Sequence, residues 1–170
     1  MNNYIMLDGR KFEIDEKNSM FLRAVVGEEK EEKKNPFTRK NGQMYYYISG
    51  FGSVAFSSEC RTNTDDNRYE VGNYCVDEKL MEQRALHETL NRLLWRFSEE
   101  NGGDENEWDG VACHYYITFQ DGIGEKKLVV EWTSQWHHQG VVFFSSILAA
   151  ERAIEEIVKP FMKNHPDFVW

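Results

Sequence analysis

Two tyrosine-rich runs most constrain how this chain can fold. The first, "MYYYISGFGSV", begins at Met44, and the second, "HYYITFQDGIG", begins at His114. Each run joins aromatic and β-branched residues to a glycine-containing turn, which is typical of a strand that enters a hairpin. Two such runs in one chain of 170 residues predict an internal duplication.

Each run opens a predicted repeat of three strands and one helix. In the first repeat, residues 44–101, we expect a second strand at "SVAFS", a loop at "ECRTNTDDN" and a third strand at "RYEVGNYCV". An amphipathic helix then begins after the N-cap residue Asp77 and carries apolar residues at helical spacing up to Phe97. In the second repeat, residues 113–170, the strands are "HYYITF", "KLVVEW" and "VVFF". Its helix, "ILAAERAIEEIV", is expected to end near Pro160, and an aromatic tail follows.

Sequential strands usually pair, so the chain is predicted to be an α+β protein built from two degenerate βββα units. Antiparallel sheets are covered by two main helices, and the two repeats are expected to share one core or one continuous sheet. Residues 1–43 precede them as an N-terminal β-hairpin, turning at Asp8-Gly9, and a charged linker. Residues 102–112 form an acidic linker between the repeats.

Acidic residues outnumber basic residues by 29 to 20, which gives a formal net charge of −9. Such a surface repels nucleic-acid backbones and anionic membranes, and it attracts basic partners. The chain has neither an apolar run long enough for a transmembrane helix nor a signal-peptide pattern at its start. Its three widely spaced cysteines fit free thiols in a reducing cytosol. We therefore predict a cytoplasmic protein.

No pattern in the sequence fixes a reaction. Cys113 and His114 are adjacent, but a thiol and its base must meet in space, which neighbouring strand residues do not do. His137 and His138 lack the spacing of a metal site, and the glycines lack the spacing of a phosphate-binding loop. We expect a binding protein rather than an enzyme, with no metal and no cofactor.

The segment "EENGGDENEWD" is the first candidate binding surface, because six of its eleven residues are acidic and none is basic. Spaced carboxylates can imitate a phosphate track, and a tryptophan can supply the apolar contact that charge lacks. A solvated linker is the alternative. The candidate partner-binding residues are Glu99, Glu100, Asp104, Glu105, Glu107, Trp108 and Asp109.

The segment "DDNRYE" is the second candidate, placed in a loop before the predicted third strand. An arginine there can pair with a carboxylate and lock the loop, or the same groups can contact a ligand or partner. The secondary candidates are Asp65, Asp66 and Arg68, together with Tyr45 and Tyr47 of the first tyrosine run.

Over residues 44–160 the chain resembles small accessory proteins encoded by phages and prophages of Gram-positive bacteria. The similar stretches are "YYYISGFGSV", "DDNRYEVGNYCVDEKLMEQ" and "GVVFFSSILAAERAIEEI". They show a tyrosine-rich strand, an acidic loop with an arginine, a Gly-Asn-aromatic step and a late strand that enters a helix. Cys75-Val76 departs from the Thr or Lys that commonly follows the aromatic residue. The resemblance implies a mobile-element protein, a class in which inhibitors of host defence are frequent.

The predicted function is inhibition of a host nucleic-acid-handling defence protein. Such an anti-CRISPR protein would block a basic partner, for example a CRISPR nuclease, through an acidic surface that mimics DNA, without binding nucleic acid or a membrane itself. It would act in the cytoplasm of the infected bacterium. The alternative is a module that sequesters a nucleotide or signalling molecule between exposed tyrosine and tryptophan rings.

Overall fold

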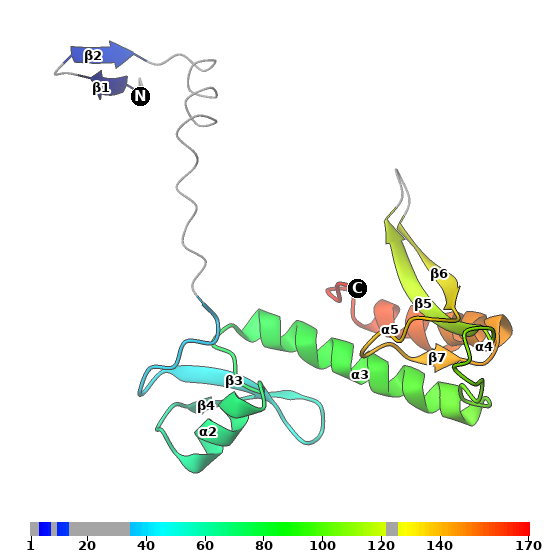
Figure 1. Ribbon diagram of the computed structural model, residues 1–170. Coiled ribbons are helices and arrows are strands. Elements are labelled where there is room, and N and C mark those ends of the chain that lie inside the picture. The colour runs from blue at the N-terminus through cyan, green and yellow to red at the C-terminus, as the bar shows by residue number, and fades with distance from the viewer. Residues whose placement is uncertain (1–3, 8–9, 14–34, 122–125) are drawn as a thin grey trace. The chain divides into compact units, whose positions relative to one another are not determined.

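The computed structural model describes residues 4–7, 10–13, 35–121 and 126–170 (Figure 1). The chain divides into two compact units, residues 1–35 and 36–170. In the first unit, β1 (Tyr4–Leu7) pairs antiparallel with β2 (Arg10–Glu13). This pairing confirms the predicted N-terminal hairpin. The Asp8-Gly9 turn and most of the predicted charged linker lie outside the described residues.

In the first repeat, β3 (Met44–Ile48) is the central strand. It pairs antiparallel with β4 (Val54–Ser58), and on its other side Tyr46 forms an isolated bridge with Cys75. Tyr46 N–H donates to the Cys75 carbonyl at 2.6 Å, and Cys75 N–H donates to the Tyr46 carbonyl at 3.0 Å. The predicted third strand is therefore reduced to one bridged residue.

A helix, α2 (Asn63–Glu70), occupies the positions predicted as a loop and as the start of that third strand, so both predictions are wrong there. Thr62 is its N-cap: the Thr62 hydroxyl accepts from Asp65 N–H, and the Asp65 carboxylate accepts from Thr62 N–H. This capping box, with Arg68 in the last turn, favours a helix in a segment without an apolar stripe. Asp65, Asp66 and Arg68 thus lie on a helix rather than in a loop.

In the second repeat, β5 (His114–Asp121) lies between β6 (Lys126–Thr133) and β7 (Phe143–Phe144), and both pairings are antiparallel. The three predicted strands are all present. Each repeat therefore places its first strand in the middle, with the second strand on one side and the third strand, or Cys75, on the other. The α+β class is confirmed, and the common strand order supports a duplication.

The bridge partners align the two repeats residue by residue. Cys75 lies two residues before the helix N-cap Asp77, and Phe144 lies two residues before the N-cap Ser146. Cys75 pairs with Tyr46, and Phe144 pairs with Tyr115. The "YYYI" that begins at Tyr45 therefore corresponds to the "HYYI" that begins at His114.

The first main helix, α3 (Glu78–Glu100), begins as predicted after Asp77, whose carboxylate accepts from Leu80 N–H at 3.1 Å. Its length of 23 residues corresponds to roughly 35 Å. In the part of the chain that the structure describes, no helix combines the length and the apolar composition needed to cross a membrane.

The second main helix does not end at Pro160, so that prediction is wrong. α4 (Ile147–Ala153) continues through a π-helical segment, η1 (Ile154–Val158), into α5 (Lys159–Asn164). Lys159 N–H donates to the Ile154 carbonyl, one residue further back than in an α-helix. The wider turn accommodates Pro160, which has no N–H to donate and whose ring would clash with the carbonyl of a regular α-turn.

The two repeats do not share one core, because α3 contributes to two separate clusters. Its first half packs Met81 and Ala85 against Ile48 and Cys75. Its second half packs Leu90, Leu94 and Phe97 against the second repeat, together with the alanines of α4 and the tail residue Phe168. Figure 1 shows β3 and β4 beside the start of α3, and α4 and α5 beside its later turns. The length of α3 separates the two clusters.

This arrangement predicts that the two cores respond separately to mutation. Met81→Ala should lower the free energy of unfolding by about 2–5 kcal/mol through lost packing in the first core, and Leu94→Ala should lower it by a similar amount through the second core. Hydrogen exchange followed by mass spectrometry should show faster exchange mainly in β3 and β4 for Met81→Ala, and mainly in β5 and α4 for Leu94→Ala. The same uniform acceleration in both variants would contradict two separate cores.

Candidate functional site

Four of the five secondary candidates form one cluster, in which Asp65, Arg68 and Tyr47 surround the buried Tyr45. The Tyr45 hydroxyl donates to Asp65 Oδ1 at 2.7 Å and accepts from Arg68 Nη1 at 2.8 Å. The Arg68 guanidinium lies 3.5 Å from the centre of the Tyr47 ring. Tyr45 is fully buried and stacks on Tyr74 with ring centroids 4.2 Å apart. The cluster attaches α2 to β3, and its polar atoms face one another rather than a ligand.

The arginine that pairs with carboxylates in this region is Arg39, which the sequence reasoning missed. Arg39 binds Glu59 through two hydrogen bonds, at 2.6 and 2.9 Å, and donates to Asp66 Oδ1 at 2.7 Å. Glu59 is fully buried, and its hydrogen bonds with Arg39 lower its pKa despite the opposing effect of burial. The only sequence signal was a basic residue in the segment predicted as a charged linker.

Asp65 is the most heavily bonded carboxylate of the first repeat. Besides Tyr45, it accepts from Cys60 N–H, Thr62 N–H and the Thr62 hydroxyl, at 2.8 to 3.1 Å. These hydrogen bonds, that from Tyr45 first, hold the pKa of Asp65 well below its usual range, although burial acts in the opposite direction. Since only an ionised carboxylate offers acceptors to every donor, Asp65 is the electrostatic centre of the α2 attachment.

The acidic loop, residues 99–109, is folded rather than an open linker. Its first two residues, Glu99 and Glu100, are the last residues of α3, and Asn101 is the C-cap of that helix. Gly102 and Gly103 then turn the chain with φ values of 98° and 61°. Beyond them, Asn106 Nδ2 donates to the Cys113 carbonyl at 2.8 Å. Asp109 Oδ1 accepts from the N–H groups of Val111 and Ala112, and these bonds lower the pKa of Asp109. The backbone of the loop is thereby tied to the start of β5.

Asp104 and Trp108 both attach the loop to the buried residue His114. Asp104 Oδ2 lies 2.7 Å from His114 Nδ1, and the Trp108 ring stacks on the imidazole at 3.5 Å with an interplanar angle of 3°. On its other face Trp108 stacks on His137 at 3.6 Å. Trp108 is therefore half-buried between two histidines, and this ring serves loop packing.

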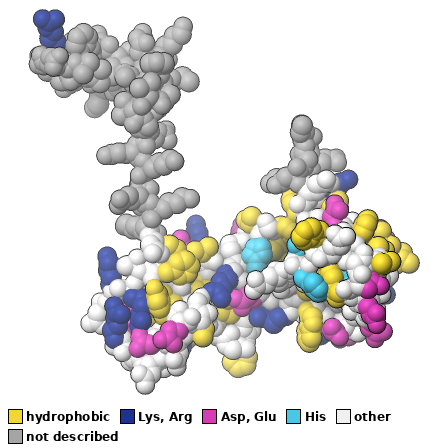
Figure 2. Space-filling view, in the orientation of Figure 1, with side chains coloured by type: hydrophobic (Ala, Val, Ile, Leu, Met, Phe, Trp, Pro, Cys, Tyr) yellow, Lys and Arg dark blue, Asp and Glu magenta, His cyan; other side chains and the backbone are white. Residues whose placement is uncertain are grey.

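The remaining acidic side chains of the loop are exposed. From Asp104 to Asp109, exposure alternates: the side chains of 104, 106 and 108 are partly covered, and those of 105, 107 and 109 are open to solvent. Alternation of this kind is typical of an extended chain that rests one side on a surface. Figure 2 shows acidic side chains gathered at the end of the larger unit that carries α4. The exposed acidic residues of the loop are Glu99, Glu100, Glu105, Glu107 and Asp109.

The Asp104–His114 pair has the geometry in which a carboxylate orients a catalytic imidazole. His114 is fully buried, however, and Trp108 covers its ring, so a substrate has no route to Nε2 in this structure. Among the described residues, no three His, Cys, Asp or Glu side chains gather as metal ligands do. The pair orients the acidic loop.

The bonds at Asp65 predict a specific loss of stability at low pH. Its pKa is lower in the folded chain than in the unfolded chain, so ionised Asp65 stabilises the fold above the unfolded pKa of about 4. That contribution is lost as the pH falls through the lower, folded value. Asp65→Asn should lower the free energy of unfolding by about 1–3 kcal/mol at pH 7, because an amide leaves some of the donors around it unsatisfied. The same change should reduce the loss of stability between pH 7 and pH 2, because the amide does not titrate. Melting temperatures between pH 2 and pH 7 test this.

Asp66→Asn is the matched control. The Asp66 side chain is 46% exposed, and the asparagine keeps an oxygen that can accept from Arg39. The free energy of unfolding of this variant should therefore fall by less than about 1 kcal/mol. Equal losses in the two variants would contradict the central role of Asp65.

No family model, no curated protein and no solved structure matches this chain. The resemblance to phage accessory proteins therefore stays a prediction.

Proposed function

We propose that this chain is a mobile-element inhibitor that binds a basic, nucleic-acid-handling defence protein of its bacterial host. A CRISPR nuclease in the host cytoplasm is an example of such a partner. One observation carries the proposal: Glu105, Glu107 and Asp109 are exposed at alternate positions of a loop that the hydrogen bonds of Asp104 and Asn106 anchor. The resemblance to phage accessory proteins supplies the biological setting.

The spacing of these carboxylates supports mimicry of a phosphate track. Residues two apart are separated by at most about 7 Å of extended backbone. This separation is shorter than the screening length of about 8 Å at physiological salt. The fields of neighbouring carboxylates therefore add, as the fields of successive phosphates do, and attract a groove lined with lysine and arginine.

An exposed tryptophan beside the loop supplies the apolar contact that charge lacks. Trp136 is 68% exposed, and the next residue, His137, stacks on Trp108 of the loop. Large aromatic side chains are the residues that most often dominate binding energy at protein interfaces. The sequence predicted this apolar contact for Trp108. We assign it to Trp136 instead, because Trp108 is already packed between two histidines.

The direct test is inhibition of guide-loaded CRISPR nucleases from Gram-positive bacteria, titrated with this chain in a DNA-cleavage assay. At least one nuclease should lose DNA binding, and the inhibition should weaken as salt rises from about 0.05 to 0.5 M, because screening shortens the reach of the exposed charges. Glu105→Gln with Glu107→Gln should weaken binding by about two- to thirty-fold, mainly through slower association.

Glu70→Gln with Glu82→Gln is the control, because it removes the same charge from exposed positions of the first repeat. It should inhibit as the parent does. Asp104 and Asp109 are left unchanged, since they hold the loop in place. Full inhibition by the Glu105 and Glu107 variant, or no inhibition of any nuclease by the parent, would reject the proposal.

The anchoring role of Trp136 predicts a different kinetic change. Trp136→Ala should increase the dissociation rate of the complex with the inhibited nuclease and leave the association rate nearly unchanged, because apolar anchors act after encounter. Surface plasmon resonance separates the two rates. Phe51→Ala removes a 99% exposed ring from the β3–β4 turn and should change neither rate. An unchanged dissociation rate for Trp136→Ala would remove this residue from the interface.

A further inference from the structure

The outer edge of β6 is an open strand edge in the second repeat. The strand order β6–β5–β7 leaves one side of β6 without a neighbouring strand. Among the described residues, no backbone hydrogen bond joins β6 to a segment outside its sheet. In an antiparallel sheet, every second residue of an edge strand directs its N–H and C=O away from its neighbour. β6 therefore presents a row of unpaired backbone groups.

β6 lacks most of the features that keep an edge strand from pairing with another chain. Natural sheets protect their edges with short strands, proline, bulges and charged side chains. β6 has eight residues and no proline, whereas the edge strands β4 and β7 have five and two residues. Its pairing with β5 is continuous from Lys126 to Thr133, so no bulge interrupts it. The remaining protection is charge, at the exposed residues Lys127 and Glu131.

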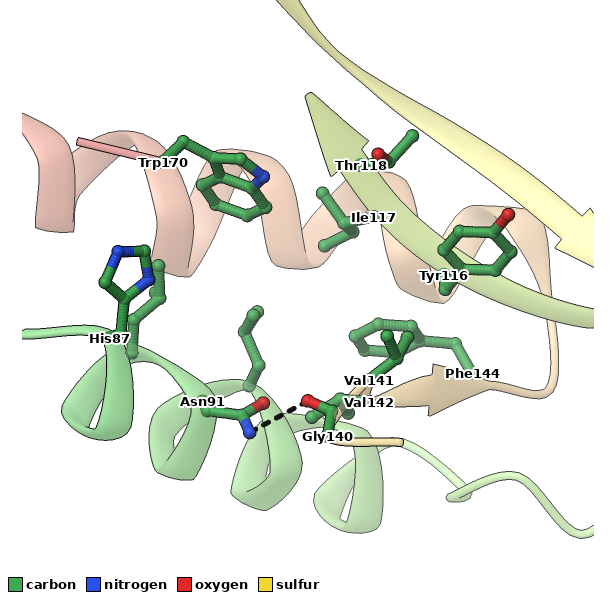
Figure 3. A pocket seen from close by; sticks show the side chains of 12 residues that line it. His87, Asn91, Tyr116, Ile117, Thr118, Gly140, Val141, Val142, Phe144 and Trp170 are labelled. Atoms are coloured by element: carbon green, nitrogen blue, oxygen red, sulfur yellow. Dashed lines mark hydrogen bonds between the residues drawn. The ribbon is translucent and has the colours of Figure 1, made fainter. Parts of the chain in front are cut away.

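One face of β6 belongs to the second core. Leu128 and Val130 pack against that core together with Ile117 of β5, which is paired with Val130. In Figure 3, Ile117 points toward α3, into a cavity of about 370 Å³ that Trp170 also lines, and Thr118 lies on the other side of β5. The sheet therefore has a core-facing side and an outer side.

The outer side of β6 carries two opposite charges. Lys127, Val129 and Glu131 alternate with the core-facing residues, so they lie on the side of Thr118. Neither Lys127 nor Glu131 forms an ion pair with a described residue. The two are about 14 Å apart along the strand, because each residue adds about 3.4 Å. They are therefore too distant to pair within one chain.

We propose that the edge of β6 binds the same edge of a second copy of this chain, antiparallel and with a two-fold axis level with Val129. In this register Lys127 of each copy lies opposite Glu131 of the other, at the Cβ separation of about 4.5–5.5 Å that is typical of directly paired residues. On the core-facing side, Leu128 lies opposite Val130 of the second copy. The open backbone groups of both edges pair, and the strands form one sheet in the order β7–β5–β6–β6–β5–β7.

The charges select this register and a second copy as the occupant. An axis level with Lys127 or Glu131 would place two identical charges opposite each other, and an axis level with Leu128 or Val130 would place each charge opposite Val129. Only the axis at Val129 pairs every lysine with a glutamate, so both charges find their complement in the same sequence. This interface does not depend on the partner proposed for the acidic loop.

The exposed ring of Trp132 also gains a neighbour in this register. Trp132 is 60% exposed at the end of β6 and lies on the core-facing side, two residues beyond Val130. In the paired edges it is diagonal to Leu128 of the second copy, at a distance that large aromatic side chains reach. The pairing thus covers apolar surface as well as backbone groups.

Sedimentation velocity of the full chain between about 5 and 200 μM tests the proposal. One strand pair is a small interface, so a dimer should form with a Kd of about 1–100 μM. Lys127→Glu and Glu131→Lys each place like charges opposite each other twice, and each should weaken dimerisation at least about tenfold. A parent chain that stays monomeric at 200 μM, or a variant that dimerises as the parent does, would overturn the proposal.

Mixing the two variants tests the register itself. The mixture of Lys127→Glu and Glu131→Lys chains should form a heterodimer, because the acidic edge of one then faces the basic edge of the other. A chain with both substitutions should dimerise as the parent does. Lys79→Glu and Glu70→Lys make the same charge changes at exposed positions of the first repeat and should leave dimerisation unchanged. If the mixed variants are folded by circular dichroism and still do not associate, the axis at Val129 is wrong.

Discussion

An amphipathic helix can bury only one stripe of side chains, and α3 uses successive parts of its stripe for two different sheets. An isolated two-stranded sheet is at best marginally stable, and a short three-stranded sheet still has an apolar face to bury, so the β3–β4 sheet and the β6–β5–β7 sheet both depend on the helix turns that cover them. The first sheet receives Met81 and Ala85, and the second receives Leu90 and Leu94. The second repeat adds its own helix, which is why its core is the larger of the two clusters.

The duplicated strand places a buried polar ring at the same position in both repeats, and each ring binds an aspartate. Tyr45 bonds Asp65 of α2, and His114 bonds Asp104 of the acidic loop. Each ring is also stacked on another aromatic residue, Tyr74 in the first case and Trp108 in the second. A buried polar group is costly unless it is hydrogen-bonded, so this position holds a neighbouring segment in both repeats. The segments differ: one is a helix with internal bonds, and the other is an acidic loop.

The features predicted correctly are those with a local signal. Glycine turns, alternating strands and the leucine spacing of α3 depend on neighbours in sequence, and they gave the N-terminal hairpin, the second repeat and the α+β class. The helix α2 was missed because its stability comes from the capping box at Thr62 and contacts with Tyr45, while its own residues have no apolar stripe. The hydrogen bonds between Arg39 and Glu59 connect residues far apart in the chain, and so does the lining of the cavity beside Trp170. No local sequence pattern predicts such contacts. Of the acidic segment, the sequence indicated the charge but not the anchoring of Trp108.

The anchored acidic loop has an entropic consequence for any partner that recognises it. Fixing the backbone of one residue costs about 1–2 kcal/mol of conformational entropy at 25 °C. In residues 104–109 this cost is met during folding, by the bonds of Asp104, Asn106 and Asp109 and by the stacking of Trp108. A disordered acidic tail of equal charge would bear the same cost on association, at the expense of affinity. A short row of carboxylates on a rigid loop can therefore compete with a much longer flexible polyanion for the same basic groove.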